Sequence, residues 1–183
     1  IGEGAQREIL QNIEALGKNT VHIRHKGVDD KNLGEVIDES AGLSLADVEG
    51  IRELVLSARS VGYLALHHVG SSNLAVDTAN LVVAGVSEGM MEILDLDVAR
   101  GRTLLPQDHL AAQRVVVIGS ELAQTLFGDD ALGQFVRLDQ QYFEVVGVLA
   151  PRLNTNLDVG FDLGLANKAL IMPYPTLHEQ LRP

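Results

Sequence analysis

Histidines are the side chains of this sequence best suited to bind a metal ion, since the chain has six of them and no cysteine. His22 and His25 lie three residues apart, and His67 and His68 are adjacent. If these segments are strands, side chains at odd spacings point to opposite faces, so neither pair can share a metal ion without help from another segment. We therefore predict histidines at the surface or at strand edges, with no bound metal or cofactor.

Ser120 is the serine best placed to act as a nucleophile, because Gly119-Ser120 falls at a predicted strand-to-helix turn. In a nucleophile elbow the serine has a glycine two residues away on each side, in the motif Gly-x-Ser-x-Gly. Here Ile118 and Leu122 occupy those two positions. Serine is also a preferred helix cap. We therefore interpret Ser120 as a cap and predict no catalytic residue in the chain.

Carboxylates are the candidates for general acid–base catalysis. They occur as close pairs at Asp29 and Asp30, Asp95 and Asp97, and Asp129 and Asp130. Each pair lies in polar, loop-like sequence, where a carboxylate stays solvated and keeps an ordinary pKa. We predict that all of them form part of the solvated surface.

Nucleotide binding would need a loop of the form Gly-x-x-x-x-Gly-Lys-[Ser/Thr], whose glycines and lysine surround the phosphates. The nearest sequence is Gly17-Lys18-Asn19. Asn12 stands at the position of the first glycine, and Asn19 stands where the hydroxyl residue belongs. The chain is therefore predicted not to bind ATP.

The overall composition argues against nucleic acid and anionic lipid as partners. Fourteen Lys and Arg against 25 Asp and Glu give a formal net charge of −11, so phosphate groups repel the chain. Aromatic residues make up only 4% and tryptophan is absent, which removes the stacking surfaces of single-strand binders. Apolar residues reach 46%, enough for a core, but no run is long enough to span a membrane and the first residues are too polar for a signal-peptide core.

Hydrophobic periodicity predicts two amphipathic helices in the first third of the chain. One covers residues 5–16 and stops at Gly17, because glycine readily adopts the left-handed conformation of a helix end. The other begins at Ser44, with Asp47 placed to complete a capping box. Its buried apolar face is expected to consist of Leu45, Val48, Ile51 and Val55.

The remaining segments alternate between strands and short helices without a regular βαβ repeat, which predicts the α+β class. Ser87 is expected to cap a short helix that places Met90 and Met91 in the core rather than on a binding surface. Thr176 and Glu179 form the pattern of a capping box for a last helix. Strands are expected at residues 20–24, 61–69, 81–86, 114–119, 135–138, 142–149 and 169–172, and loops at 25–42 and 154–167.

Four stretches match a known family in their order and spacing. They are IGEGAQREILQNIEALGKNTVHI (1–23), GLSLADVEGIREL (42–54), VVAGVSEGMMEILDLDVARGRTL (82–104) and RVVVIGSELAQTLFGDDALGQFVRLDQQYFEVVGVLA (114–150). In the fourth, Gly119, Gly128 and Gly133 lie at a predicted turn, a helix end and the start of a hairpin. The sequence resembles the extracytoplasmic domain of MacB-type ABC-transporter permeases, which are related to the lipoprotein-releasing and FtsX-like permeases.

This resemblance implies a domain of two lobes that is not itself an enzyme. We expect a stalk helix from the membrane at residues 1–16, a porter-like α/β lobe at 17–79 and 151–183, and a smaller inserted β-rich lobe at 80–150. The implied function is to couple ATP hydrolysis in a separate nucleotide-binding domain to export or extraction of substrate on the periplasmic side.

The resemblance also implies partners and a location. The partners are a nucleotide-binding ATPase domain or subunit, a second permease copy in a homodimer, a periplasmic adaptor and an outer-membrane exit duct. The domain is expected on the extracytoplasmic side of the bacterial inner membrane.

Two features depart from the family pattern. The hairpin tip Asp139-Gln140-Gln141 lacks the usual Asn-Gly, which favours a longer or bulged turn. Family members also continue beyond the equivalent of residues 171–181 with a strand, a helix and a strand, whereas this sequence ends at Pro183. An exposed sheet edge is therefore expected.

Two other functions remain open from the residues alone. One is a periplasmic hydrolase that uses a metal or carboxylates, and a His67/His68 double variant would test it. The other is a stand-alone periplasmic binding protein, which would need a closed ligand pocket.

Overall fold

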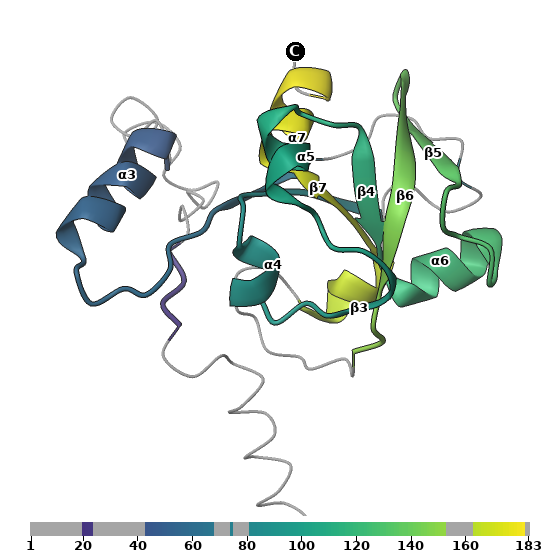
Figure 1. Cartoon of the computed structure of the whole chain (residues 1–183), viewed down its shortest axis with the longest axis horizontal. Coiled ribbons are helices and arrows are strands. Elements are labelled where there is room, and N and C mark those ends of the chain that lie inside the picture. Colours follow the sequence, from purple (N-terminus) through teal and green to yellow (C-terminus); the bar gives the residue numbers. More distant parts are fainter. Residues whose placement is uncertain (1–19, 24–42, 68–73, 75–80, 153–162, 182–183) are drawn as a thin grey trace, which may run out of the picture.

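The computed structural model describes residues 20–23, 43–67, 74, 81–152 and 163–181 (Figure 1). The predicted helix over residues 5–16 and the predicted loop over residues 25–42 lie outside this part of the chain. Within it, no helix is both long enough and apolar enough to cross a membrane.

One mixed sheet forms the centre of the described chain, with the strand order β1-β2-β7-β4-β6-β3 and with β5 also paired to β6. Strand β6 is the longest: β4 runs parallel along one of its edges, and β5 and β3 share the other edge. The strands are β1 (Leu64–His67), β2 (Val82–Val86), β3 (Val98–Gly101), β4 (Val115–Ile118), β5 (Phe135–Leu138), β6 (Gln141–Leu149) and β7 (Ala169–Pro173). The helices are α3 (Leu45–Leu54), α4 (Met90–Ile93), α5 (Pro106–Leu110), α6 (Ser120–Phe127), η3 (Leu163–Lys168) and α7 (Tyr174–Gln180).

Each face of the sheet carries its own apolar core, because side chains alternate along the central strands. In β4, Val116 joins the core under α6 and α7, whereas Val117 joins the core under α4 and η3. Met90 and Met91 of α4 are buried in the second core, as predicted. The predicted α+β class is confirmed.

The strands of this sheet do not follow the predicted lobe boundaries at residues 80 and 150. Strand β7, from residues 151–183, lies between β2 and β4, which both come from residues 80–150. Strand β1, from residues 17–79, pairs with β2. Segments assigned to both predicted lobes therefore build one hydrogen-bonded sheet.

Helix α3 lies apart from the sheet (Figure 1) and carries the predicted capping box, in which Ser44 and Asp47 bond each other's backbone N–H. The prediction of a buried face is wrong for this helix, because none of its residues is buried. A second correction concerns the strand expected at residues 20–24, since residues 20–23 adopt no regular secondary structure. Val21 and Ile23 of this segment are exposed.

The β5–β6 hairpin corrects another prediction. Leu138 pairs directly with Gln141, which leaves a two-residue turn instead of the longer or bulged turn expected. Asp139 supplies the left-handed conformation that the turn requires, with φ 52°, and aspartate tolerates this conformation better than most residues.

Candidate functional site: a polar network around Asp108

The histidines do not converge on a metal site in the described residues. His22 is exposed, and His67 lies in the edge strand β1 with its Nε2 3.6 Å from Asp139 Oδ2. His25 and His68 lie outside the described part of the chain. Among the residues described, no group of three or more His, Asp or Glu side chains is arranged to bind a metal ion.

The paired carboxylates that the structure describes lie at the surface. Asp95, Asp97, Asp129 and Asp130 are all exposed, which confirms the prediction of a solvated surface for these four residues. The Asp29-Asp30 pair and the Gly17-Lys18-Asn19 segment lie outside the described residues.

Ser120 has a role that the sequence did not reveal. Helix α6 begins at Ser120 itself, with Gly119 as the N-cap and no side-chain cap, so the predicted capping role is wrong. The Ser120 hydroxyl instead donates a hydrogen bond to Asn167 Oδ1 at 3.2 Å. Ser120 thus joins α6 to η3.

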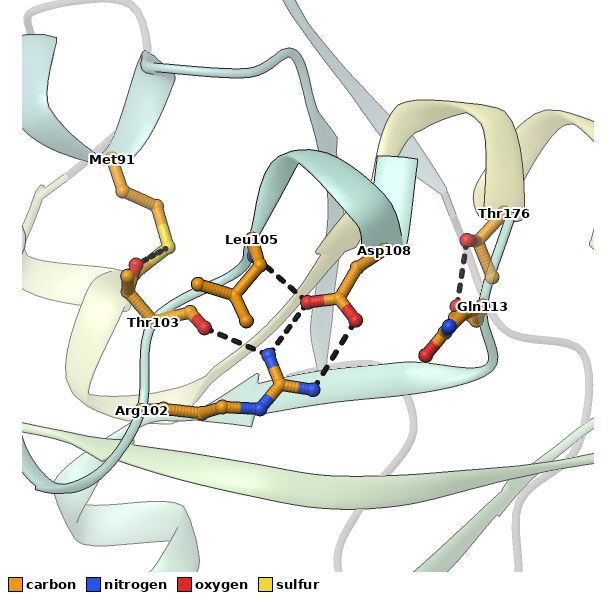
Figure 2. A network of polar contacts seen from close by, with 7 residues as sticks. All are labelled: Met91, Arg102, Thr103, Leu105, Asp108, Gln113 and Thr176. Atoms are coloured by element: carbon orange, nitrogen blue, oxygen red, sulfur yellow. Dashed lines mark hydrogen bonds and ion pairs between the residues drawn. The ribbon is translucent and has the colours of Figure 1, made fainter. Parts of the chain in front are cut away.

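Among the described residues, Asp108 in α5 is the one charged residue that is buried, and its side chain is 0% exposed. Arg102 donates hydrogen bonds to both carboxylate oxygens, with Nη1 2.6 Å from Oδ2 and Nη2 3.2 Å from Oδ1 (Figure 2). The Leu105 N–H donates to Oδ2 at 2.8 Å. Because both oxygens are occupied and shielded from solvent, Asp108 cannot act as an acid or base toward a substrate.

Burial and hydrogen bonding act in opposite directions on Asp108. Burial raises the pKa of the Asp108 carboxyl, but the bonds from Arg102 and Leu105 and the guanidinium charge outweigh it, so the net pKa lies below the ordinary value. At the adjacent His109, burial lowers the pKa of the imidazole against the opposing charges of Glu88 and Asp108. At neutral pH, Asp108 therefore stays ionised and His109 neutral.

The chain that leaves β3 passes very close to β6 beside this network, and two glycines make the close approach possible. Gly101 has φ 81°, and a Cβ there would lie 2.3 Å from the Val146 carbonyl oxygen. A Cβ on Gly147 would lie 2.3 Å from the Arg102 carbonyl oxygen. The Arg102 N–H also donates to the Val146 carbonyl at 2.9 Å. Residues 101–102 of the stretch 82–104 thus pack against residues 145–148 of the stretch 114–150.

The network extends from this crossing towards two helices. The Thr103 hydroxyl contacts the Met91 sulfur of α4 at 3.3 Å, and the Thr103 carbonyl accepts from Arg102 Nη1 at 3.0 Å. Beyond α5, the Thr176 hydroxyl of α7 donates to the Gln113 carbonyl at 2.8 Å (Figure 2). These contacts hold the connection between β3 and β4, which contains α5, against α4 through Thr103 and against α7 through Gln113.

Two crevices flank α4, and neither is a closed ligand pocket. One lies between α4 and the start of β3 and has a volume of about 270 Å³. The other reaches from Ser87 to His109 and has a volume of about 170 Å³. Both fall below the roughly 300–1,000 Å³ of typical small-molecule sites, so these crevices do not favour a stand-alone binding protein.

Several transport proteins are similar to this chain in sequence. The permease YknZ of Bacillus subtilis is 28% identical over 81% of the chain, and the macrolide export protein MacB of Agrobacterium fabrum is 27% identical over 97%. The pyoverdine export protein PvdT of Pseudomonas syringae pv. tomato is 25% identical over 91%. The chain spans only 37%, 26% and 24% of the lengths of these three relatives, respectively.

Two solved structures share the fold. The extracellular domain of YknZ has a TM-score of 0.66 at 24% identity, and the match covers 90% of this chain and 78% of that one. The periplasmic region of MacB from Actinobacillus actinomycetemcomitans also has a TM-score of 0.66, at 20% identity, and covers 96% and 74% of the two chains. The family description "MacB-like periplasmic core domain" matches residues 1–183. The chain therefore belongs to the family of MacB-like periplasmic core domains.

Proposed function

We propose that this chain is the extracytoplasmic domain of an ABC-transporter permease and that it couples cytosolic ATP hydrolysis to export or extraction of substrate on the periplasmic side. The observation that carries the proposal is the family match over all 183 residues. Relatives named as export ATP-binding/permease proteins support it. The domain acts by transmitting motion and by binding partners, and it carries out no chemistry.

The internal structure of the domain fits this role. A domain that transmits force must resist deformation, and charge-assisted hydrogen bonds to a buried charge resist it well, because pulling the partners apart leaves the buried charge unpaired. Arg102, which is half-buried, forms such bonds with the buried Asp108 where the chain crosses β6. The contacts from Thr103 to Met91 and from Thr176 to Gln113 extend the support to α4 and α7.

The partners follow from the same proposal. They are a nucleotide-binding ATPase domain or subunit, a second permease copy in a homodimer, and a periplasmic adaptor with an outer-membrane exit duct. The location is the inner membrane of a bacterium, with this domain on its outer side. The acidic charge of −11 would favour basic surfaces on the partners.

Proline at Gln11 tests the proposal in the full-length permease. The sequence predicts a helix over residues 5–16, and proline in its middle removes a backbone hydrogen bond and clashes with the preceding turn, at a cost of about 3 kcal/mol or more. We expect Gln11→Pro to leave the ATPase rate largely intact while export falls. Both rates are measured on the same membranes.

Gln11→Ala is the matched control, because alanine is a strong helix former and Gln11 lies off the apolar face of the predicted helix. It should transport like the wild type. Normal export by a folded Gln11→Pro variant would show that motion does not pass through this helix.

A further inference from the structure

The side chain of Asn167, a residue only 4% exposed, joins three separate segments. Its Oδ1 accepts hydrogen bonds from the Ser120 hydroxyl at 3.2 Å and from the Arg152 N–H at 3.0 Å. Its Nδ2 donates to Glu121 Oε1 at 3.3 Å and to the Arg152 carbonyl at 2.8 Å. A side-chain amide has two donor hydrogens and two acceptor lone pairs, so every hydrogen-bonding position of Asn167 is occupied.

Arg152 continues this junction to a third helix. Asn167 bonds the Arg152 backbone at both its N–H and its carbonyl. These two bonds fix the backbone position from which the arginine side chain extends. That side chain donates from Nη1 to the Leu94 carbonyl at 2.8 Å and from Nη2 to Asp95 Oδ2 at 3.3 Å. Leu94 is the C-cap of α4 and Asp95 follows it, at the end where helix carbonyls lack partners within the helix.

The two helices joined in this way cover opposite faces of the sheet. Helix α6 packs on the core that contains Val116, and α4 packs on the core that contains Val117. The backbone contact is also close, since a Cβ on Gly119 would lie 2.3 Å from the carbonyl oxygens of Ala166 and Asn167. The junction therefore links the two helical layers around one end of the sheet.

We propose that Asn167 and Arg152 fasten α4 to α6, so that the helical layers on the two faces of the sheet move as one body. Asn167 is a positioning residue: it holds the backbone from which Arg152 reaches α4. The mechanical importance of this junction rests on the transmission function proposed above. The coupling between α4 and α6 is a property of the fold and can be tested separately.

Site-resolved hydrogen exchange on the 183-residue chain tests the coupling. For α4 the reporters are the Leu94 and Leu96 amides, which donate to the carbonyls of Met90 and Met91. For α6 the reporter is the Ala123 amide, which donates to the carbonyl of the N-cap Gly119. We expect Asn167→Asp to accelerate exchange at both sets by about tenfold, as the net loss of one or two hydrogen bonds implies. The substitution keeps the acceptor oxygens but removes both donated bonds.

Arg152→Ala should accelerate exchange at α4 by a similar factor and leave α6 unchanged. Arg100→Ala is its matched control, because Arg100 Nη1 also donates to a backbone carbonyl, that of Asp129, at 2.8 Å. It should change neither reporter set. In the double variant Asn167→Asp/Arg152→Ala, the exchange rate at α4 should equal that of Arg152→Ala alone, since both changes break the same link.

The coupling is refuted if Asn167→Asp accelerates α6 but leaves α4 protected, or if it accelerates all amides of the sheet by one common factor. Should Asn167→Asp not fold, Ser120→Ala combined with Glu121→Ala removes the bonds to α6 from outside the core. Faster exchange at α4 would then support the fastening, and unchanged exchange there would refute it.

Transport assays distinguish this inference from the proposed function. In the full-length permease, Arg152→Ala should lower export per ATP hydrolysed relative to Arg100→Ala. If the exchange pattern appears but Gln11→Pro exports normally, the fastening stands and the transmission function fails. If the exchange pattern is absent while Gln11→Pro uncouples export, the function stands and the fastening fails.

Discussion

The protonation of Asp108 should control the stability of the β3–α5 connection. The pKa of this carboxyl is lower in the folded chain than in the unfolded chain, so the unfolded state binds the proton more readily. The stabilisation from Asp108 is therefore complete above the ordinary carboxyl pKa and is lost as the pH falls through the lower folded value. Acid should loosen this connection before it disrupts purely apolar contacts.

Asp108→Asn keeps the shape of the side chain and removes its charge. We expect it to destabilise the chain by about 1–3 kcal/mol at pH 7, because the amide nitrogen cannot accept one of the two bonds from Arg102 and the remaining bond loses its charge assistance. Urea unfolding between pH 7 and pH 3 measures this, and the difference from the wild type should shrink at the acid end. Asp130→Asn changes an exposed carboxylate and is the control. An equal loss in both variants would contradict a special role for Asp108.

Gly147 should tolerate no side chain. A Cβ there would lie 2.3 Å from the Arg102 carbonyl oxygen, so Gly147→Ala must displace the chain that crosses β6. We expect a loss of about 2 kcal/mol or more in thermal or urea unfolding. Gly50→Ala is a suitable comparison, since nothing lies within 4 Å of the added carbon. If Gly147→Ala has the same stability as the wild type, the chain at Arg102 can move away from β6 without cost.

At the scale of the elements, hydroxyl side chains explain which predictions of helix caps failed. Ser44 is exposed and caps α3 as its sequence pattern predicts. Ser87, Ser120 and Thr176 carry the same signal, but their hydroxyls bond the Tyr63 N–H, Asn167 Oδ1 and the Gln113 carbonyl. Local sequence shows that a hydroxyl is available near a helix start. It does not show a competing partner that folding brings from a distant segment.

Hydrophobic runs predicted the strands more reliably than capping patterns predicted the helix starts. The segments around β2, β4, β6 and β7 are rich in Val, Ile and Leu and fold as strands near their predicted bounds. Strand β3 and helix α5 were not predicted, because the sequence from Val98 to Leu110 has neither a clear alternation nor a helical face. The Arg102–Asp108 pair was missed for a related reason. Charged residues six apart in loop-like sequence are normally solvated, and folding places Asp108 in a buried position beside the half-buried Arg102.

Removing the Ser44 hydroxyl should affect α3 alone. We expect Ser44→Ala to weaken the helix by about 1 kcal/mol through loss of the capping box, visible as faster amide exchange at Val48 and Val55. Because α3 buries none of its residues, the midpoint of global unfolding should not move. A clear fall in that midpoint would show that α3 belongs to the cooperative core.

At the scale of the whole molecule, the sheet predicts how the domain opens. Two independent lobes divided at residues 80 and 150 would give two cooperative units in native-state hydrogen exchange. Strand β7, however, is paired on both sides with strands of the 80–150 segment. We therefore expect β2, β4, β6 and β7 to open as one unit with a common denaturant dependence, and separate opening of residues 80–150 would restore the two-lobe division.

The central position of β7 also matters while the chain is being made. Ribosomes deliver the N-terminal segments first, so β2 and β4 emerge long before residues 169–173 can fill the place between them. During that interval both strands present apolar faces and unpaired backbone groups, the features that lead nascent chains to aggregate. A polypeptide released prematurely, before β7, would therefore not be a smaller working domain but a substrate for chaperones and proteases.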